Sequence, residues 1–221
     1  MSGKWRVQAL RTRRAEHGTT VVEVTVVLLL LGIVMATFYA GLFGAARTVS
    51  GTEERLRNLA EARVIVAVAS KDLRTAVRLS GGSSPFVVAD DNEVVFYANL
   101  DTTGAPKKVR VHVDANDQLV EEVWTADAGS VAPNFTYSGS PAVRFVGQYV
   151  ANGPSSPIFT FYDDNGTVLG PTPLAGTNLL GIDAVGITFK VKRTSAFNDA
   201  YTTVVNRVRL PNVDYNAVAG G

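Results

Sequence analysis

GTTVVEVTVVLLLLGIVMATFYAGLFGAA, residues 18–46, is the stretch that decides how this chain folds. No charged residue lies between Val24 and Ala46, and a helix of these 23 residues would be about 34 Å long at roughly 1.5 Å per residue. That length is enough to cross the ~30 Å hydrocarbon core of a bilayer. The stretch therefore predicts a membrane-spanning helix that carries one acid, Glu23, near its start.

Basic residues precede this helix and predict its orientation. Five positive charges stand before Gly18 against the single acid Glu16; they are Lys4, Arg6, Arg11, Arg13 and Arg14. Because positively charged flanks stay in the cytoplasm, we expect a single-pass protein of the cytoplasmic (inner) membrane with its N-terminus inside and everything after Arg47 outside. A cleaved secretory signal would have a shorter apolar region of roughly 7 to 15 residues.

Composition limits the function classes. The 221 residues are 46% hydrophobic and 19% charged, enough for one domain with a core besides the membrane segment. A net charge of +1, without a basic cluster beyond the N-terminus, gives no sign of nucleic-acid binding. The absence of cysteine excludes disulfides, thiolate metal sites and cysteine nucleophiles.

Residues 51–80 predict an amphipathic continuation of the helix. Apolar side chains recur at steps of three, four or seven, at Leu56, Leu59, Ile65, Val66, Ala69, Leu73, Ala76 and Val77. Gly51 is a candidate interruption, and Gly81 with Gly82 predicts the helix end. Arg63 and Ser70 interrupt the heptad seam that a coiled coil would need.

After Gly82 the sequence turns to short β-branched and aromatic runs separated by turn residues. These runs are residues 85–100, 107–124, 142–150, 156–170, 184–193 and 201–210. Asn165-Gly166 is the clearest hairpin signal, because a two-residue turn of this kind needs positive φ. The sequence thus predicts an α+β fold in which a long N-terminal α-helix, half membrane-spanning and half amphipathic, packs on an antiparallel β-sheet head.

The sequence contains no recognisable catalytic motif. His17 and His112 cannot form a cluster, His112 alternating with valines on an expected strand, and no hydrolase, nucleotide-binding or zinc-protease motif occurs. We therefore expect no enzyme and no cofactor. Two acidic turns leave calcium as one weak candidate ligand, through Asp114, Asn116, Asp117, Asp163 and Asp164, although tight turns alone explain these residue types.

The features around Gly18 together resemble those of the type IV pilin family, which includes the pseudopilins of type II secretion. A basic leader ends at Gly18, Glu23 follows five residues on, and Gly32 follows fourteen residues on. The resemblance implies that a prepilin peptidase removes residues 1–18, so that Thr19 begins the mature chain. Most of the family begins with phenylalanine or methionine, so N-methylation of Thr19 stays open.

Glu23 acquires a specific role if this cleavage occurs. A carboxylate inside a bilayer costs several kcal/mol unless it is paired or close to the interface. Cleavage after Gly18 would create an α-amino group at Thr19, about one helical turn from Glu23. The pair could form within one helix or between neighbouring helices, and the pilin resemblance implies the second. A plain headgroup position for Glu23 is the alternative.

The resemblance implies a structural subunit, made in the membrane and then polymerised into an extracellular or periplasmic filament. Its parts would be a leader at 1–18, a transmembrane and filament-core helix at 19–50, an amphipathic continuation at 51–80 and a β-rich head at 81–221. NRVRLPN, residues 206–212, adds a resemblance to J-type pseudopilins and W-type minor pilins. Implied partners are membrane lipid, other pilin or pseudopilin subunits, the prepilin peptidase, a platform protein and an assembly ATPase.

Two other functions remain open. An uncleaved single-span surface protein, with a ligand-binding β-rich head outside the cell, would share the apolar helix. An extracellular enzyme is the third reading.

Overall fold

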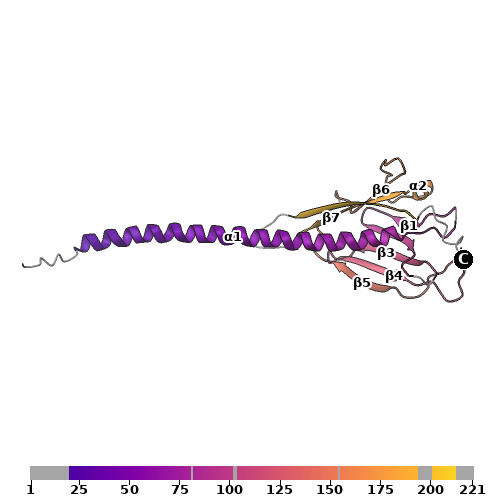
Figure 1. Cartoon of the computed structure of the whole chain (residues 1–221), viewed down its shortest axis with the longest axis horizontal. Helices are drawn as coiled ribbons and strands as arrows, with labels where there is room; N and C mark the ends of the chain where they lie inside the picture. The colour runs from indigo at the N-terminus through magenta and orange to yellow at the C-terminus, as the bar shows by residue number, and fades with distance from the viewer. Residues whose placement is uncertain (1–19, 81, 102–103, 154, 194–200, 213–221) are drawn as a thin grey trace, which may run out of the picture. The chain divides into compact units, whose positions relative to one another are not determined.

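A computed structural model describes residues 20–80, 82–101, 104–153, 155–193 and 201–212, and it confirms the α+β class (Figure 1). Its elements are one long helix, one short helix and eight strands, all within that part of the chain. The chain divides into two compact units, residues 1–48 and 49–221, which are described separately.

Helix α1 (Val21–Arg74) passes through Gly51 without interruption. It ends at Arg74, so the stop predicted at the glycine pair is wrong. The reason is strand pairing: Val77 N–H donates to Tyr97 O at 2.8 Å, and Asn99 N–H donates to Thr75 O at 2.9 Å. The backbone after Arg74 is thus bonded to a strand of the head and cannot continue the helix.

Beyond residue 48, α1 buries one face under the head. The predicted apolar face is confirmed at Ile65, Val66, Ala69 and Leu73. It is wrong at Leu56, which is 61% exposed, because burial begins only at Asn58. Three polar residues, Asn58, Ser70 and Asp72, are buried on the same helix.

The larger sheet is an antiparallel meander of five strands in the order β1-β2-β3-β4-β5. The strands are β1 (Phe86–Ala89), β2 (Glu93–Ala98), β3 (Lys107–Val113), β4 (Leu119–Trp124) and β5 (Ala142–Gly147). On β3, buried Val109 and Val111 alternate with half-buried Arg110 and His112, as the sequence predicted for a sheet with one buried face.

A second antiparallel sheet holds β6 (Phe159–Tyr162), β7 (Ala184–Val191) and β8 (Thr202–Arg209), in that order. The short helix α2 (Thr177–Leu180) precedes β7. The sequence predicted a single sheet, but only isolated bonds join the two; the amides of Ile158 and Phe159, for example, both donate to Asp91 O. Figure 1 shows the end of α1 between these sheets, where Asn206 Nδ2 on β8 donates to Ser70 Oγ at 2.8 Å.

The turn predicted at Asn165-Gly166 is confirmed, but its return strand is not. Gly166 has φ +79°, and Asp163 N–H donates to Thr167 O at 3.0 Å. The chain then makes a single bridge, between Tyr162 and Val168, and leaves the sheet. β6 pairs instead with β7.

Helix and both sheets share one hydrophobic core. Phe86 of β1 contacts Phe96 of β2 and Phe161 of β6, with ring centroids 5.9 Å and 6.2 Å apart. Ile65 and Leu73 of α1 are fully buried in the same cluster. Aromatic side chains therefore join the two sheets where backbone pairing does not.

Gly147 of β5 lies close against α1. A Cβ at this position would overlap Ile65 Cγ1 and lie 3.2 Å from Glu61 Oε1. We expect Gly147→Ala to lower the free energy of unfolding by about 1 to 3 kcal/mol, because the packed core has no room for it. Chemical denaturation measures this loss. Gly139→Ala is the control, since a Cβ there meets nothing within 4 Å, and an equal loss in both variants would contradict the packing argument.

Candidate functional site

Glu23, which the sequence analysis expects to act in assembly, lies in the first turn of α1. Thr20 Oγ1 accepts the N–H of Glu23 at 3.3 Å, which makes Thr20 the N-cap of the helix. Thr20 and Glu23 form a T-x-x-E pattern, which is a sequence signal for the start of a helix. The carboxylate also suits the positive end of the helix dipole. Gly18 and Thr19 lie outside the described residues.

Apart from Glu23 and three hydroxyl groups, the surface of α1 between Val21 and Phe43 is apolar. Its large side chains are 47% to 83% exposed; they are Val21, Val22, Val24, Val26, Val27, Leu28, Leu29, Leu30, Leu31, Ile33, Val34, Met35, Phe38, Tyr39, Leu42 and Phe43. Helix α1 is long and apolar enough to cross a membrane. Such a surface needs a non-aqueous cover, which lipid or apolar protein can supply.

The threonine hydroxyls within and just beyond this apolar stretch are satisfied within the helix. The hydroxyls of Thr25 and Thr37 donate to the carbonyls of Val21 and Val34, each at 2.8 Å, and Thr48 donates to Gly44 O at 3.0 Å. No water is needed to complete these bonds, so the stretch tolerates an apolar environment.

Small residues leave room for another helix. Gly32, Ala36, Ala40 and Gly44 recur at steps of four and thus lie along one strip of α1. A Cβ added at Gly32 or Gly44 would meet no other atom within 4 Å. Strips of small residues let helix backbones approach closely in membranes.

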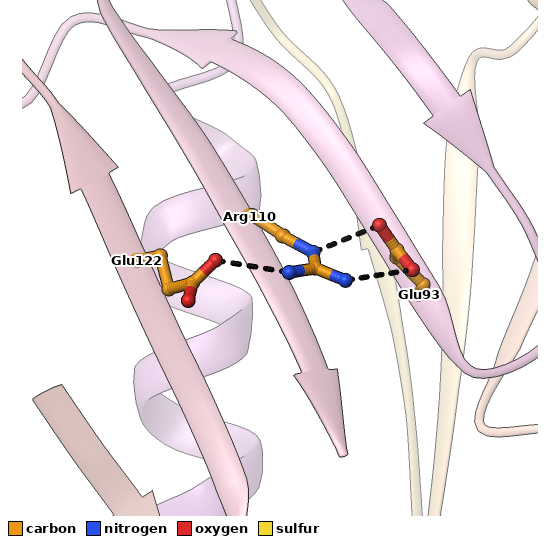
Figure 2. A network of polar contacts seen from close by, with 3 residues as sticks. All are labelled: Glu93, Arg110 and Glu122. Atoms are coloured by element: carbon orange, nitrogen blue, oxygen red, sulfur yellow. Dashed lines mark hydrogen bonds and ion pairs between the residues drawn. The ribbon is translucent and has the colours of Figure 1, made fainter. Parts of the chain in front are cut away.

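The outer face of the larger sheet carries an ion-pair network. Figure 2 shows Arg110 of β3 between Glu93 of β2 and Glu122 of β4, on the face turned away from α1. Arg110 Nε and Nη2 bind Glu93 at 2.9 and 3.3 Å, and Nη1 binds Glu122 at 3.1 Å. The hydrogen bonds to Glu93 are the main cause that raises the pKa of Arg110. This network joins three strands of the sheet.

A second charge cluster joins two buried acids, one on α1 and one on the same sheet, to an exposed arginine. Asp72 of α1 and Glu121 of β4 are each 4% exposed. Arg144 of β5 donates from Nε and Nη2 to Glu121 Oε2, and Nη2 lies 3.5 Å from Asp72 Oδ2. Burial is the main cause that raises the pKa of Asp72 to about 7, and the negative charge of Glu121 is the second. The positive charges of Arg144 and Lys71 oppose this rise.

The acidic turn between β3 and β4 uses its carboxylate to shape the backbone. Asp114 Oδ1 accepts the N–H groups of Asn116 and Gln118, each at 2.9 Å, and these bonds lower the pKa of Asp114. Asp117 lies in the same turn with φ 57°. The turn thus has a conformational role for the residues that suggested calcium.

The turn after β6 is similar. Asp163 Oδ1 accepts the N–H of Thr167 at 2.6 Å, and Arg207 and Arg209 line the same hollow as Asp163 and Asp164. Positive charge beside these carboxylates opposes a divalent cation. Among the described residues no three His, Asp or Glu side chains gather as a metal site. From the sequence we expect no cofactor and keep calcium only as a weak candidate, which is untested.

Comparison with known proteins does not identify a family. No protein-family profile matches the chain, and no curated protein matches it in sequence. The function must therefore be inferred from the geometry of α1 and of the head.

Asp72 predicts a dependence of stability on pH. Because its pKa is about 7 in the folded chain and 3.8 in the unfolded one, the fold holds a proton that the unfolded chain releases. Stability should therefore fall as pH rises from about 4 to about 7 and stay constant above. Asp72→Asn should remove this loss and raise the free energy of unfolding at pH 8 by about 2 to 4 kcal/mol.

Thermal and chemical unfolding between pH 4 and pH 8 measure this effect. Glu53→Gln is the matched control, since Glu53 is an exposed acid on the same helix. A lower stability of Asp72→Asn at pH 8 would mean that attraction to Arg144 outweighs burial.

Proposed function

We propose that this chain is a structural subunit, of the minor kind, in a type IV pilus or a type II secretion-like pseudopilus. One observation carries the proposal: a single helix exposes apolar side chains all round from Val21 to Phe43 and then buries one face under a β-rich head from Asn58 on. A helix with two such parts suits a subunit that is held by lipid before assembly and by other helices after it.

The order of assembly steps follows from the two environments of the apolar stretch, which are lipid before assembly and other helices after it. The basic residues before Gly18 hold the N-terminus in the cytoplasm while the head is exported. A prepilin peptidase removes the leader after Gly18, and the apolar stretch of α1 then passes from lipid into contact with other subunits. A platform protein and a cytoplasmic ATPase would drive that transfer. The strip that includes Gly32 and Gly44 supports close contact between helices.

Glu23 gives this transfer a specific attraction. Glu23 follows the new N-terminus by four residues in the sequence, so its carboxylate can pair with the terminal amine of a neighbouring subunit. The N-cap bond of Thr20 uses the backbone N–H of Glu23 and leaves the side chain available. In an apolar surrounding such a pair is favourable only when both charges are present, because either one alone is costly.

An uncleaved single-span surface protein is the alternative. It would use the same apolar stretch as a permanent lipid anchor, and nothing in the shape of α1 separates the two readings. Cleavage after Gly18 does separate them.

The mature chain should begin at Thr19. Intact-mass and N-terminal analysis of the protein extracted from membranes checks this directly. Gly18→Leu is the control variant and should retain the leader. A wild-type chain that begins at Met1 would support the uncleaved anchor. A cut beyond Ala46 would contradict both the filament subunit and the uncleaved anchor.

Glu23→Ala should leave cleavage and membrane insertion intact and reduce recovery in sheared filaments at least tenfold, since about 1.4 kcal/mol of lost attraction is already tenfold. Glu23→Gln, which keeps the size of the side chain, should behave in the same way. Immunoblots of membrane and sheared fractions measure both quantities.

Thr20→Ala is the matched control for this test. It removes the N-cap hydroxyl and keeps the carboxylate, so filament recovery should change little. If Thr20→Ala abolishes assembly and Glu23→Gln does not, helix capping and not charge pairing governs the start of α1.

A further inference from the structure

The head contains a polar cavity that the proposed function does not use. It has a volume of about 430 Å³ and lies where the β3–β4 turn meets the segment after β5 and the end of β7. Its lining includes Asp117, Gln118, Gln148, Tyr149 and Lys192. Pockets of this size are in the range that holds small ligands.

Tyr149 is strained. Its φ is 63°, and Asp117 (φ 57°) is the only other non-glycine residue with positive φ in the described part of the chain. Asp117 is explained by its tight turn, where aspartate tolerates this conformation. A tyrosine in the left-handed region has no such explanation, and strain of this kind gathers at functional sites.

The backbone bonds around Tyr149 do not require its side chain. Val150 N–H donates to Asp117 O, and Lys192 N–H donates to Tyr149 O, both at 2.9 Å. Glycine would make the same bonds without strain. Tyrosine therefore adds its ring and its hydroxyl. The ring is 38% exposed and lies 4.6 Å from the guanidinium of Arg193, and the hydroxyl accepts from Arg193 Nη2 at 3.4 Å.

Three other polar side chains on the lining can bind a ligand, those of Asp117, Gln118 and Gln148. The carboxylate of Asp117 and the amides of Gln118 and Gln148 make no hydrogen bond to any described residue; only the backbone groups of these three do. Amides both donate and accept, and a carboxylate accepts. Asp117 and Lys192 carry opposite charges, so the lining does not select a ligand with a large net charge.

We propose that this cavity binds a saccharide unit. Each sugar hydroxyl both donates and accepts a hydrogen bond, which matches two amides and a carboxylate. The apolar face of a sugar ring can contact an aromatic ring such as that of Tyr149, which provides a rigid surface with few torsions to immobilise. The inference is independent of the filament proposal, since an uncleaved surface protein could carry the same site.

Saturation-transfer NMR on the full chain in detergent micelles tests the site, with glucose, galactose, mannose and N-acetylglucosamine at millimolar concentrations as the probes. At least one of them should receive saturation from the wild-type chain. Tyr149→Gly and Asp117→Gly should each weaken that binding at least tenfold in titrations. Both glycines relieve a positive φ, so the melting temperature of each variant should equal or exceed that of the wild type.

Tyr201→Ala is the control variant. Tyr201 is also exposed and also lies beside a cation, with Lys190 Nζ 5.2 Å from its ring, but it is not part of the cavity lining. Its loss should leave sugar binding unchanged. The proposal is overturned if none of the four sugars receives saturation from the wild-type chain, or if Tyr149→Gly binds them as the wild type does.

Discussion

The apolar surface of α1 between Val21 and Phe43 is the constraint on which the rest of the structure depends. Its side chains are exposed all round, and the two threonine hydroxyls within it donate to carbonyls of the helix itself. Water is a poor solvent for such a surface. The chain must therefore keep it in lipid or against other apolar helices.

The head buries one face of the C-terminal half of the same helix. From Asn58 on, two sheets cover one face of α1 and share its core, with Gly147 letting β5 approach Ile65 closely. The cover includes a charge cluster in which buried Asp72 and Glu121 share the guanidinium of Arg144. A buried pair of acids with one base is a costly arrangement at neutral pH, so this interface is more stable when Asp72 holds a proton.

Much of this architecture could be predicted from sequence because it is locally encoded. The apolar run, the alternation around Val109 and the turn at Gly166 each depend on neighbouring residues alone. The helix end at Arg74 and the division into two sheets depend on which distant strand pairs with which backbone, and periodicity does not contain that information. At the candidate site the proposed role of Glu23 comes from the sequence around Gly18, whereas the strain at Tyr149 is visible only in three dimensions.

Cysteine cross-linking between copies tests the central claim that the apolar stretch of α1 exchanges lipid for other helices. The chain has no cysteine of its own, so single substitutions from Val24 to Ala46 report without background. In membranes these positions should resist a water-soluble maleimide. In sheared filaments, substitutions along the strip of Gly32, Ala36, Ala40 and Gly44 should cross-link one subunit to another. Labelling throughout the stretch in membranes, or filaments without any such cross-link, would contradict the account.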